Sequence, residues 1–404
     1  MNTALLISIT VKDFAGSELA TLEQANYLEK LGWQVSIFTL ELGSPLKELI
    51  PDSIAIFDLN NISTMPRQFN LIIARQYPLL DYIIFNQKIT ASKIYYECVG
   101  YALPQDTFPI YYKHLSLTGA VSETAKTKLE EKGFDCSKTF ISPNTADDKC
   151  YEIARSELPN IPANFAIVSN HMPTEILEVA ERLRSLRNTR VDLYGMGHNF
   201  IRVTPELLSK YDVVITIGKT AFNSTSLGIP TYCYDENVSS GYVTESNLEA
   251  NVKWNFAIKE NYHKKNVEEI KSELFSEFSE VSNQQSVIKN FAKAHFSRAK
   301  SIEVLLNKID ESPDVNFDEL YGNYPGMAEQ SRTFVEYFAF SRSEILRWYN
   351  KSTELGDLYQ NEMSKFLSLC KANEDLTNQL NALLNSKGWK LLEILRKPIK
   401  AFNR

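Results

Sequence analysis

The regular alternation of short apolar runs with helically spaced leucines constrains the fold of this chain more than any other feature. Two apolar runs, Ala4–Ile9 and Val35–Leu40, flank a segment whose apolar residues recur every three or four positions. These residues are Leu19, Leu22, Ala25, Leu28 and Leu31. Ser17 is placed to cap this helix, and Gly32 can end it in the left-handed conformation. The order strand, helix, strand predicts a βαβ unit, and therefore a parallel sheet with right-handed crossovers.

The same alternation continues as far as Asp235. The first series adds five strands, at Ser53–Asp58, Leu71–Ala74, Lys93–Tyr96, Leu117–Val121 and Phe140–Ser142, and one helix, Glu123–Lys132, that Ser122 opens. The second series has strands at Phe165–Ser169, Val191–Tyr194, Asp212–Ile217 and Thr231–Tyr234, and helices at Pro173–Leu186 and Lys219–Leu227. A chain of 404 residues is long enough for two or three cores. The pattern therefore predicts an α/β protein with two doubly wound, Rossmann-like lobes.

The character of the sequence changes from about Ile302 onward. Glu311–Gly326 is rich in Asp, Pro, Gly and Asn and indicates a linker, whereas Ser331–Leu384 is helical in composition with an irregular apolar stripe. One interpretation of the stripe is a helical hairpin packed on the lobes, and the other is self-association of the 355–384 helix as a coiled coil. We therefore expect a first lobe over 1–150, a second lobe over 151–305, a linker over 306–330 and a helical extension over 331–404.

Composition and charge exclude several classes of protein. A hydrophobic fraction of 44% with 23% charged residues is globular, and a net charge of −7 does not suit a chain that wraps nucleic acid. The start, Met1–Thr10, lacks the basic region of a signal peptide, and the sequence has no apolar stretch long enough to span a membrane. The five cysteines show no CxxC spacing. These features predict a cytoplasmic protein with reduced thiols.

Two turns between a strand and a helix are candidates for binding phosphate. Gly16, in the segment Phe14–Glu18, lets a ligand approach the backbone at the positive end of a helix. Gly218-Lys219-Thr220 follows a buried strand and opens a helix, so backbone N–H groups and the Lys219 ammonium suit phosphate oxygens. It is not a Walker loop, because the first glycine of that motif is absent. In the structural alternatives, Gly16 is needed only for the geometry of its turn, and Lys219 is a solvated side chain at the start of a helix.

Taken in order, these segments resemble a GT-B glycosyltransferase of the broad group that includes the family 4 retaining enzymes. The matching pieces span roughly Met1 to Leu248 and include Gly16-Ser17-Glu18, Val121-Ser122-Glu123, Ser142-Pro143-Asn144, Ser169-Asn170-His171, Gly195-Met196-Gly197 and Gly218 to Pro230. The resemblance implies the GT-B fold and a second lobe that binds a nucleotide-sugar facing the cleft. The donor-binding residues that it implies are Gly16, Ser17, Ser169, Asn170, Gly195, Gly197, Gly218, Lys219, Thr220, Asn223, Asp235, Gly241 and Tyr242.

This sequence departs from the family pattern at three places. Asn223 stands where relatives have a glutamate bonded to the ribose, and an amide lacks the charge-assisted strength of a carboxylate. The stretch Tyr95–Gly100 has no histidine near the expected sugar, which leaves Glu97 and the cleft-facing His171 as candidate catalytic residues. The loop Asp235–Gly241 is not glycine-rich. A structural role is the alternative for Glu97 and for His171.

The basic tail Ser386–Arg404 has six basic residues against Glu393 alone, interleaved with Trp389 and other apolar residues. It resembles a tail common on bacterial surface-polysaccharide glycosyltransferases and suits an anionic membrane surface. The alternative is a tail docked on the acidic surface of the chain. No aromatic platform supports nucleic-acid binding.

The expected activity is that of a hexosyltransferase that uses a nucleotide-sugar donor and a glycan or lipid-linked acceptor in surface-polysaccharide assembly at the inner membrane face. No metal or other cofactor is expected, because the sequence has no DxD motif and its histidines show no metal-ligand spacing. One rival is a non-catalytic GT-B lobe pair that binds a nucleotide-sugar or glycan or scaffolds a partner. Another is a nucleotide-sugar epimerase of the same architecture, for which the sequence lacks a set of cleft carboxylates.

Overall fold

The structure is a computed structural model that describes residues 2–100, 106–155, 157–259, 262–385 and 388. The chain divides into two compact units, Met1–Val335 and Glu336–Arg404. The first unit contains two β-sheets with helices around them, and the described part of the second is helical. The predicted basic tail, 386–404, lies outside the described residues except at position 388.

The first sheet has seven strands in the order β3-β2-β1-β4-β5-β6-β7, all parallel. The strands are β1 (Thr3–Val11), β2 (Gln34–Leu42), β3 (Ala55–Phe57), β4 (Gln68–Ala74), β5 (Thr90–Cys98), β6 (Leu117–Ala120) and β7 (Phe140–Ile141). Its helices are α1 (Gly16–Lys30), α2 (Tyr77–Asp81), the π-helix η3 (Tyr82–Asn86) and α3 (Glu123–Glu131), with short 3₁₀ turns η1 (Lys47–Leu49), η2 (Ile62–Thr64) and η5 (Tyr112–His114). All the strands predicted in this lobe are present, as are the helix after β1 and α3.

Both faces of the first sheet are buried because side chains alternate along each strand. On β1, Leu5 and Ile7 belong to one hydrophobic cluster, and Ala4 and Leu6 belong to another on the opposite face. All four side chains are fully buried. The uninterrupted apolar run that predicted this strand is therefore the mark of a sheet covered by helices on both sides.

The second sheet has five strands in the order β12-β11-β10-β8-β9. They are β8 (Asn164–Val168), β9 (Arg190–Tyr194), β10 (Val213–Thr216), β11 (Thr231–Asp235) and β12 (Val238–Tyr242), and β12 pairs antiparallel with β11. The helices of this lobe are η6 (Asp148–Tyr151), α4 (Thr174–Arg184), α5 (Pro205–Leu208), α6 (Gly218–Leu227), α7 (Leu248–Lys253), α8 (Val267–Ser276) and α9 (Phe278–His295). The segment 235–241, predicted as a loop, is instead a hairpin that extends the sheet.

Local hydrogen bonds explain where several helices begin. The Ser122 hydroxyl accepts from the Ala125 N–H at the start of α3, and the Thr204 hydroxyl accepts from the Leu207 N–H ahead of Pro205. The cap at Ser122 agrees with the sequence prediction. The predicted cap at Ser17 is wrong, because α1 begins at Gly16 with Ala15 before it and has no side-chain cap.

After the second lobe the chain returns to the first. Leu305 and Ile309 of α10 (Arg298–Glu311) lie in the hydrophobic cluster that contains Ala4 and Leu6. Leu320 of α11 (Phe317–Asn323) is fully buried in the cluster on the other face of the same sheet. The span 306–330 was predicted as a linker, but it contains packed helix. The prediction was wrong because it used the Asp- and Gly-rich composition, and composition does not show that a single leucine is buried.

The C-terminal helix α12 (Met327–Asn385) is continuous over 59 residues. Its first turns belong to the first unit, where Met327 and Val335 are buried in the core. A helical extension is therefore confirmed, while the hairpin interpretation is wrong for the described residues, since no break occurs between 327 and 385.

Candidate functional site

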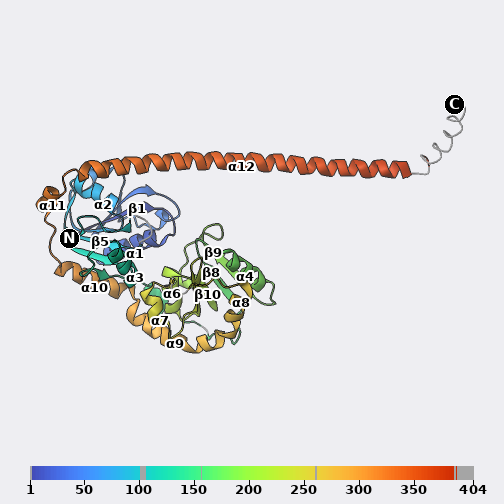
Figure 1. Ribbon diagram of the computed structural model, residues 1–404, viewed down its shortest axis with the longest axis horizontal. Coiled ribbons are helices and arrows are strands. Elements are labelled where there is room, and N and C mark those ends of the chain that lie inside the picture. The colour runs from blue at the N-terminus through green and yellow to red at the C-terminus, as the bar shows by residue number, and fades with distance from the viewer. Residues whose placement is uncertain (1, 101–105, 156, 260–261, 386–387, 389–404) are drawn as a thin grey trace, which may run out of the picture. The chain divides into compact units, whose positions relative to one another are not determined.

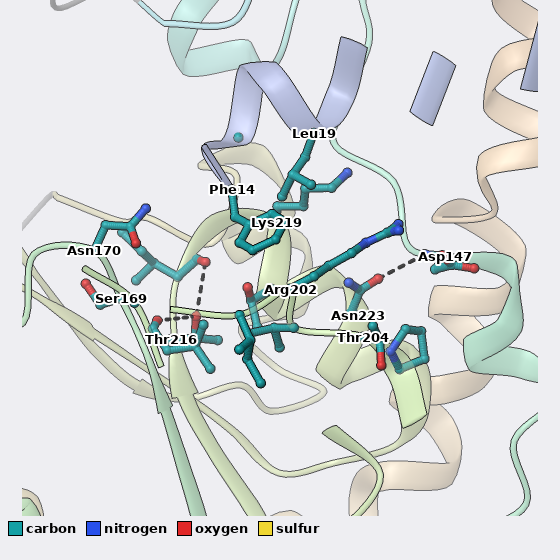
Figure 2. A pocket seen from close by; sticks show the side chains of 18 of the residues that line it. Phe14, Leu19, Asp147, Ser169, Asn170, Arg202, Thr204, Thr216, Lys219 and Asn223 are labelled. Carbon is teal, nitrogen blue, oxygen red and sulfur yellow. Dashed lines mark hydrogen bonds between the residues drawn. The ribbon is translucent and has the colours of Figure 1, made fainter. Parts of the chain in front are cut away.

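A cavity of about 340 Å³ lies at the carboxyl ends of β8 and β10, the two central strands of the second sheet. Strand order reverses between these strands, and such switch points are where open α/β sheets bind ligands. Figure 2 shows Phe14 and Leu19 of the first lobe on one side of the cavity and Ser169 and Asn170 on another. A cavity of this size is within the range of small-molecule sites.

The end of β8 forms one wall of this cavity, which we call the interlobe cavity. The Ser169 hydroxyl accepts a hydrogen bond from the His171 N–H, and the Asn170 side-chain oxygen accepts from the Met196 N–H at 3.2 Å. Gly195 has a φ of +133°, and a Cβ there would lie 1.9 Å from the Ser169 carbonyl oxygen. Only glycine therefore allows the β9 loop to pass this close to the end of β8.

A chain of four charged groups joins elements from both lobes beside the cavity. Lys219, the second residue of α6, places its Nζ 2.5 Å from Oε2 of Glu23 on α1. The other carboxylate oxygen, Oε1, is 3.1 Å from Nη2 of Arg298 on α10. Arg298 also lies 3.3 Å from Oδ2 of Asp147 through Nη1. The side chains of Lys219 and Glu23 are only 12% and 10% exposed, so water screens this pair weakly.

The segment that joins the lobes is held by Asp147 and Asp148. Burial raises the pKa of Asp147, but the nearby Arg298 guanidinium and a hydrogen bond from the Lys149 N–H outweigh this and leave the pKa below its ordinary value. Asp148 accepts hydrogen bonds from the Ser297 hydroxyl and the Ala299 N–H at the start of α10. These carboxylates are bound by groups more than 140 residues away, which local composition does not reveal.

The lining also includes an apolar wall and a second cation. The rings of Phe14 and Phe200, one from each lobe, have centroids 5.5 Å apart. Ile201 and Val203 follow Phe200 in the lining, and Arg202 extends across the cavity on the side of Asp147 (Figure 2). Apolar and aromatic side chains beside convergent cations suit a ligand with both a flat ring and an anionic group.

Nine of the predicted site residues line the interlobe cavity: Gly16, Ser169, Asn170, His171, Gly195, Lys219, Thr220, Asn223 and Asp235. The fold brings them together because the ends of parallel strands and the starts of the following helices meet at one edge of each sheet. Burial raises the pKa of the Asp235 carboxyl above its ordinary value. Asn223 has its side-chain oxygen occupied, since it accepts from the Asp147 N–H at 2.9 Å.

Six other predicted residues do not line it: Glu97, Ser17, Gly197, Gly218, Gly241 and Tyr242. Gly218 and Gly197 are neighbours of lining residues and have positive φ angles of +57° and +80°. Ser17 follows Gly16 on α1. Gly241 and Tyr242 lie on β12, where Tyr242 is buried in the core of the second lobe and donates its hydroxyl to the Leu274 carbonyl.

The geometry around Glu97 favours its structural alternative. Its side chain is 6% exposed and lies 2.9 Å from Nη2 of Arg75, whose side chain is fully buried. Nε of Arg75 donates to the same carboxylate oxygen, and the Tyr95 hydroxyl donates to the other. A buried guanidinium requires such a partner, so this carboxylate neutralises Arg75 inside the first lobe.

Five residues beside the cavity were not selected from the sequence: Glu23, Arg202, Arg298, Phe14 and Phe200. Glu23 lies on the helix whose apolar spacing was recognised, and its position, one turn beyond Leu19, places it on the face toward the cavity. That helix-face argument was the only available signal. Arg298 carried none, because it follows Asp147 by some 150 residues and meets it only through the return of α10.

Within the described part of the chain, no three or more His, Cys, Asp or Glu side chains gather as a metal-binding group. None of the described helices combines the length and apolar character that crossing a membrane requires.

Crystal structures of Anabaena HepE match this chain over its two lobes. The HepE complex with UDP and glucose has a TM-score of 0.56 at 12% identity, covering 77% of this chain and all of HepE. The complex with UDP-glucose has a TM-score of 0.55 at 13% identity, covering 76% and 99%. The chain has the GT-B fold. WaaG, a glycosyltransferase involved in lipopolysaccharide biosynthesis, matches more loosely, with a TM-score of 0.44 at 10% identity over 72% of this chain and 95% of WaaG. No protein-family model and no curated protein sequence matches the chain.

Proposed function

We propose that this chain is a glycosyltransferase that takes a sugar from a nucleoside-diphosphate sugar and transfers it to a glycan or lipid-linked acceptor. We further propose that it works without a metal, in surface-polysaccharide assembly at the cytoplasmic face of a membrane. The observation that carries the proposal is the position of Lys219. It stands at the start of α6, at the switch point of a GT-B lobe, beside the interlobe cavity.

The cavity supplies what such a donor needs. The start of α6 presents backbone N–H groups and the positive end of a helix, and Lys219 and Arg202 add charge that stabilises a departing diphosphate. The apolar residues Phe200, Ile201 and Val203 offer a surface for a nucleobase. HepE, with the same fold, was crystallised with UDP-glucose, which supports a uridine-diphosphate sugar as the first donor to test.

Two residues beside the diphosphate site are candidates for acting on the sugar. His171 is exposed at the end of β8, and Asp235, at the end of β11, lines the same cavity. In the proposed reaction the bond between the anomeric carbon and the diphosphate oxygen breaks, the acceptor hydroxyl oxygen bonds to that carbon, and the hydroxyl proton passes to the departing diphosphate. The diphosphate leaves with the electron pair, so groups that bind phosphate control the rate.

A binding protein without turnover is the second candidate. Two observations favour it: Glu97 is engaged with Arg75 instead of facing the cavity, and Asn223 uses its oxygen to hold the Asp147 backbone. A binder would be stabilised by the nucleotide-sugar yet release no free sugar.

The decisive experiment measures binding and turnover on the same preparation. Calorimetry with UDP, UDP-glucose and other nucleoside-diphosphate sugars reports affinity, and release of free sugar, with and without acceptor and EDTA, reports activity. Turnover that persists in EDTA supports a metal-independent transferase. Binding without any release of sugar supports the binding protein, and conversion of one free nucleotide-sugar into another would support an epimerase.

The Lys219→Ala variant tests the site assignment. Loss of a charge-assisted hydrogen bond costs about 1.5–3 kcal/mol, so we expect affinity for UDP to fall roughly ten- to hundredfold while that for uridine changes little. Lys210→Ala is the matched control, because Lys210 is exposed in the same lobe and does not line the cavity. Equal UDP affinity for the wild type and Lys219→Ala would remove Lys219 from the site.

A further inference from the structure

The long helix α12 carries a row of exposed apolar side chains between positions 345 and 383. Eight of them are between 55% and 68% exposed: Ile345, Trp348, Leu355, Phe366, Leu369, Leu376, Leu380 and Leu383. We call this row the α12 seam. A helix with so much exposed apolar surface has little to stabilise it alone, because helical stability in proteins comes mainly from packing.

All eight residues fall into one heptad register, whereas Leu358 and Leu367, which are each 60% exposed, lie off it. Phe366 and Leu380 are at position a, and Leu369, Leu376 and Leu383 are at position d. Continuing the same heptad count toward the N-terminus places Ile345 at a and Trp348 and Leu355 at d. Apolar residues at most a and d positions, with a period of 3.5 residues, mark a coiled-coil seam, which is narrower than the apolar face of a helix packed on a globular core.

Asn373 occupies position a at the centre of the best segment, between Leu369 and Leu376. A single asparagine at an a position pairs with its own copy across a two-stranded coiled coil and thereby fixes register and oligomeric state. This pairing requires parallel, in-register chains, because in an antiparallel pair a positions face d positions. Glu362 interrupts the seam at a d position, so the segment from Phe366 to Leu383 is the part with the cleanest pattern.

Charge argues against an anionic membrane as the cover for this seam. The span 351–385 has three lysines and five acidic residues. An amphipathic helix that lies on anionic lipid has a basic polar face instead.

We propose that a second copy of this chain covers the α12 seam as a parallel, in-register, two-stranded coiled coil with Asn373 paired at its centre. Eight large apolar side chains from each copy, at roughly 100 Å² each, would bury about 1,600 Å². Stable, specific protein interfaces bury about that area. This inference does not depend on the proposed enzymatic activity.

Light scattering coupled to size exclusion tests the association on the full chain. We expect about twice the chain mass of 46.1 kDa at micromolar concentration, and a single-chain mass for Leu369→Asp/Leu376→Asp. Ser368→Asp/Asn378→Asp is the matched control, because it adds the same charge at exposed positions off the seam and is expected to stay a dimer. An unchanged thermal unfolding transition of the lobes shows that each variant is folded.

Crosslinking tests the orientation. In a Cys370→Ser background, Leu369→Cys and Leu383→Cys are each oxidised separately. In a parallel, in-register pair each of these residues lies against its own copy, so both variants form a disulfide-linked dimer. The two positions are about 21 Å apart along the helix, so in an antiparallel pair they cannot both lie against their own copies. A monomeric wild type, a dimer that survives Leu369→Asp/Leu376→Asp, or crosslinking at only one position or at neither would overturn the proposal. So would a monomer that binds anionic vesicles through the seam.

Discussion

Glu23 is the residue whose position most affects how an anion could enter the interlobe cavity. Its two carboxylate oxygens contact Lys219 and Arg298, so a carboxylate of the first lobe already neutralises the lysine proposed to bind diphosphate. A nucleoside diphosphate would compete for Lys219 with Glu23 and would meet repulsion from the carboxylate. Because this ion pair is well shielded from water, the charge of the Glu23 carboxylate is weakly screened and repels a neighbouring anion strongly.

Replacing Glu23 with glutamine is therefore expected to tighten binding of UDP. The amide keeps the shape but removes the negative charge, so we expect affinity to rise about two- to tenfold, with a smaller change for uridine. Calorimetry at low salt measures the change. Glu29→Gln, on the same helix but outside the cavity lining, serves as the control. Weaker UDP binding by Glu23→Gln would mean that Glu23 instead holds Lys219 in the binding position.

Asp81 controls a pH dependence inside the first lobe. Burial raises the pKa of its carboxyl to about 7, although the Tyr111 hydroxyl donates to it at 2.5 Å. The folded chain therefore holds this proton more tightly than the unfolded chain, where the value is 3.8. The resulting stability is fully present below about pH 4 and is lost as the pH rises toward and through 7.

The Asp81→Asn variant is expected to flatten that part of the pH profile. Between pH 5 and pH 8 the wild type should lose stability relative to the variant, by an amount on the order of a few kcal/mol. Urea unfolding at the two pH values gives the comparison. Asp52→Asn, at an exposed aspartate, should follow the wild type. Parallel profiles for the wild type and Asp81→Asn would show that this carboxyl does not titrate in the window.

At the scale of elements, the short helix α11 connects α10 to α12 and is also part of the core. Leu320 is fully buried among residues such as Ile83 and Phe85, and the Tyr321 hydroxyl donates to the Ile84 carbonyl. Through these contacts the segment 317–323 holds the return of the chain against the first lobe.

Truncation of Leu320 to alanine should therefore destabilise the first lobe by about 2–4 kcal/mol, the cost of a cavity in a packed core. Chemical denaturation measures the loss. Asp318→Ala lies on the same helix but is exposed, and we expect its effect to stay within about 0.5 kcal/mol. If the two variants were equally stable, the segment would be an unpacked connection after all.

At the scale of the whole molecule, charge is distributed unevenly along the chain. Six basic residues minus Glu393 give the segment Ser386–Arg404 a charge of +5, so the remainder carries −12 of the total of −7. The tail lies outside the described residues, apart from Gly388, and its membrane role remains a prediction from sequence. Each basic residue near an anionic surface contributes about 1 kcal/mol, enough for reversible attachment.

Removal of 386–404 is therefore expected to abolish cosedimentation with anionic vesicles and leave UDP binding unchanged. The full chain should pellet with anionic but not neutral vesicles, and less at high salt, because the charges act over a Debye length of about 8 Å. Equal sedimentation of the full and truncated chains would instead favour a tail docked on the protein.

Local pattern was sufficient to predict the strands other than β12, the sheet edge where the cavity lies and the start of α6. Short uninterrupted apolar runs indicate strands that are buried on both faces of a sheet, as Leu5 and Leu6 show. The carboxyl ends of parallel strands meet at one edge of a sheet, and this places Ser169 and Lys219 at one cavity. The resemblance to a family added the GT-B arrangement of the two lobes.

Only the tertiary structure determined how the charged groups are paired. Glu97 lies within β5, one residue from its end, and neutralises Arg75, and Asp147 meets Arg298 across 151 positions of sequence. Such pairs form where elements distant in sequence pack together. The same packing buries the charged groups, and a buried charge is costly unless it is paired. The sequence by itself therefore determined the lobes and the sheet edge where the cavity lies, while the fold decided which side chains line it.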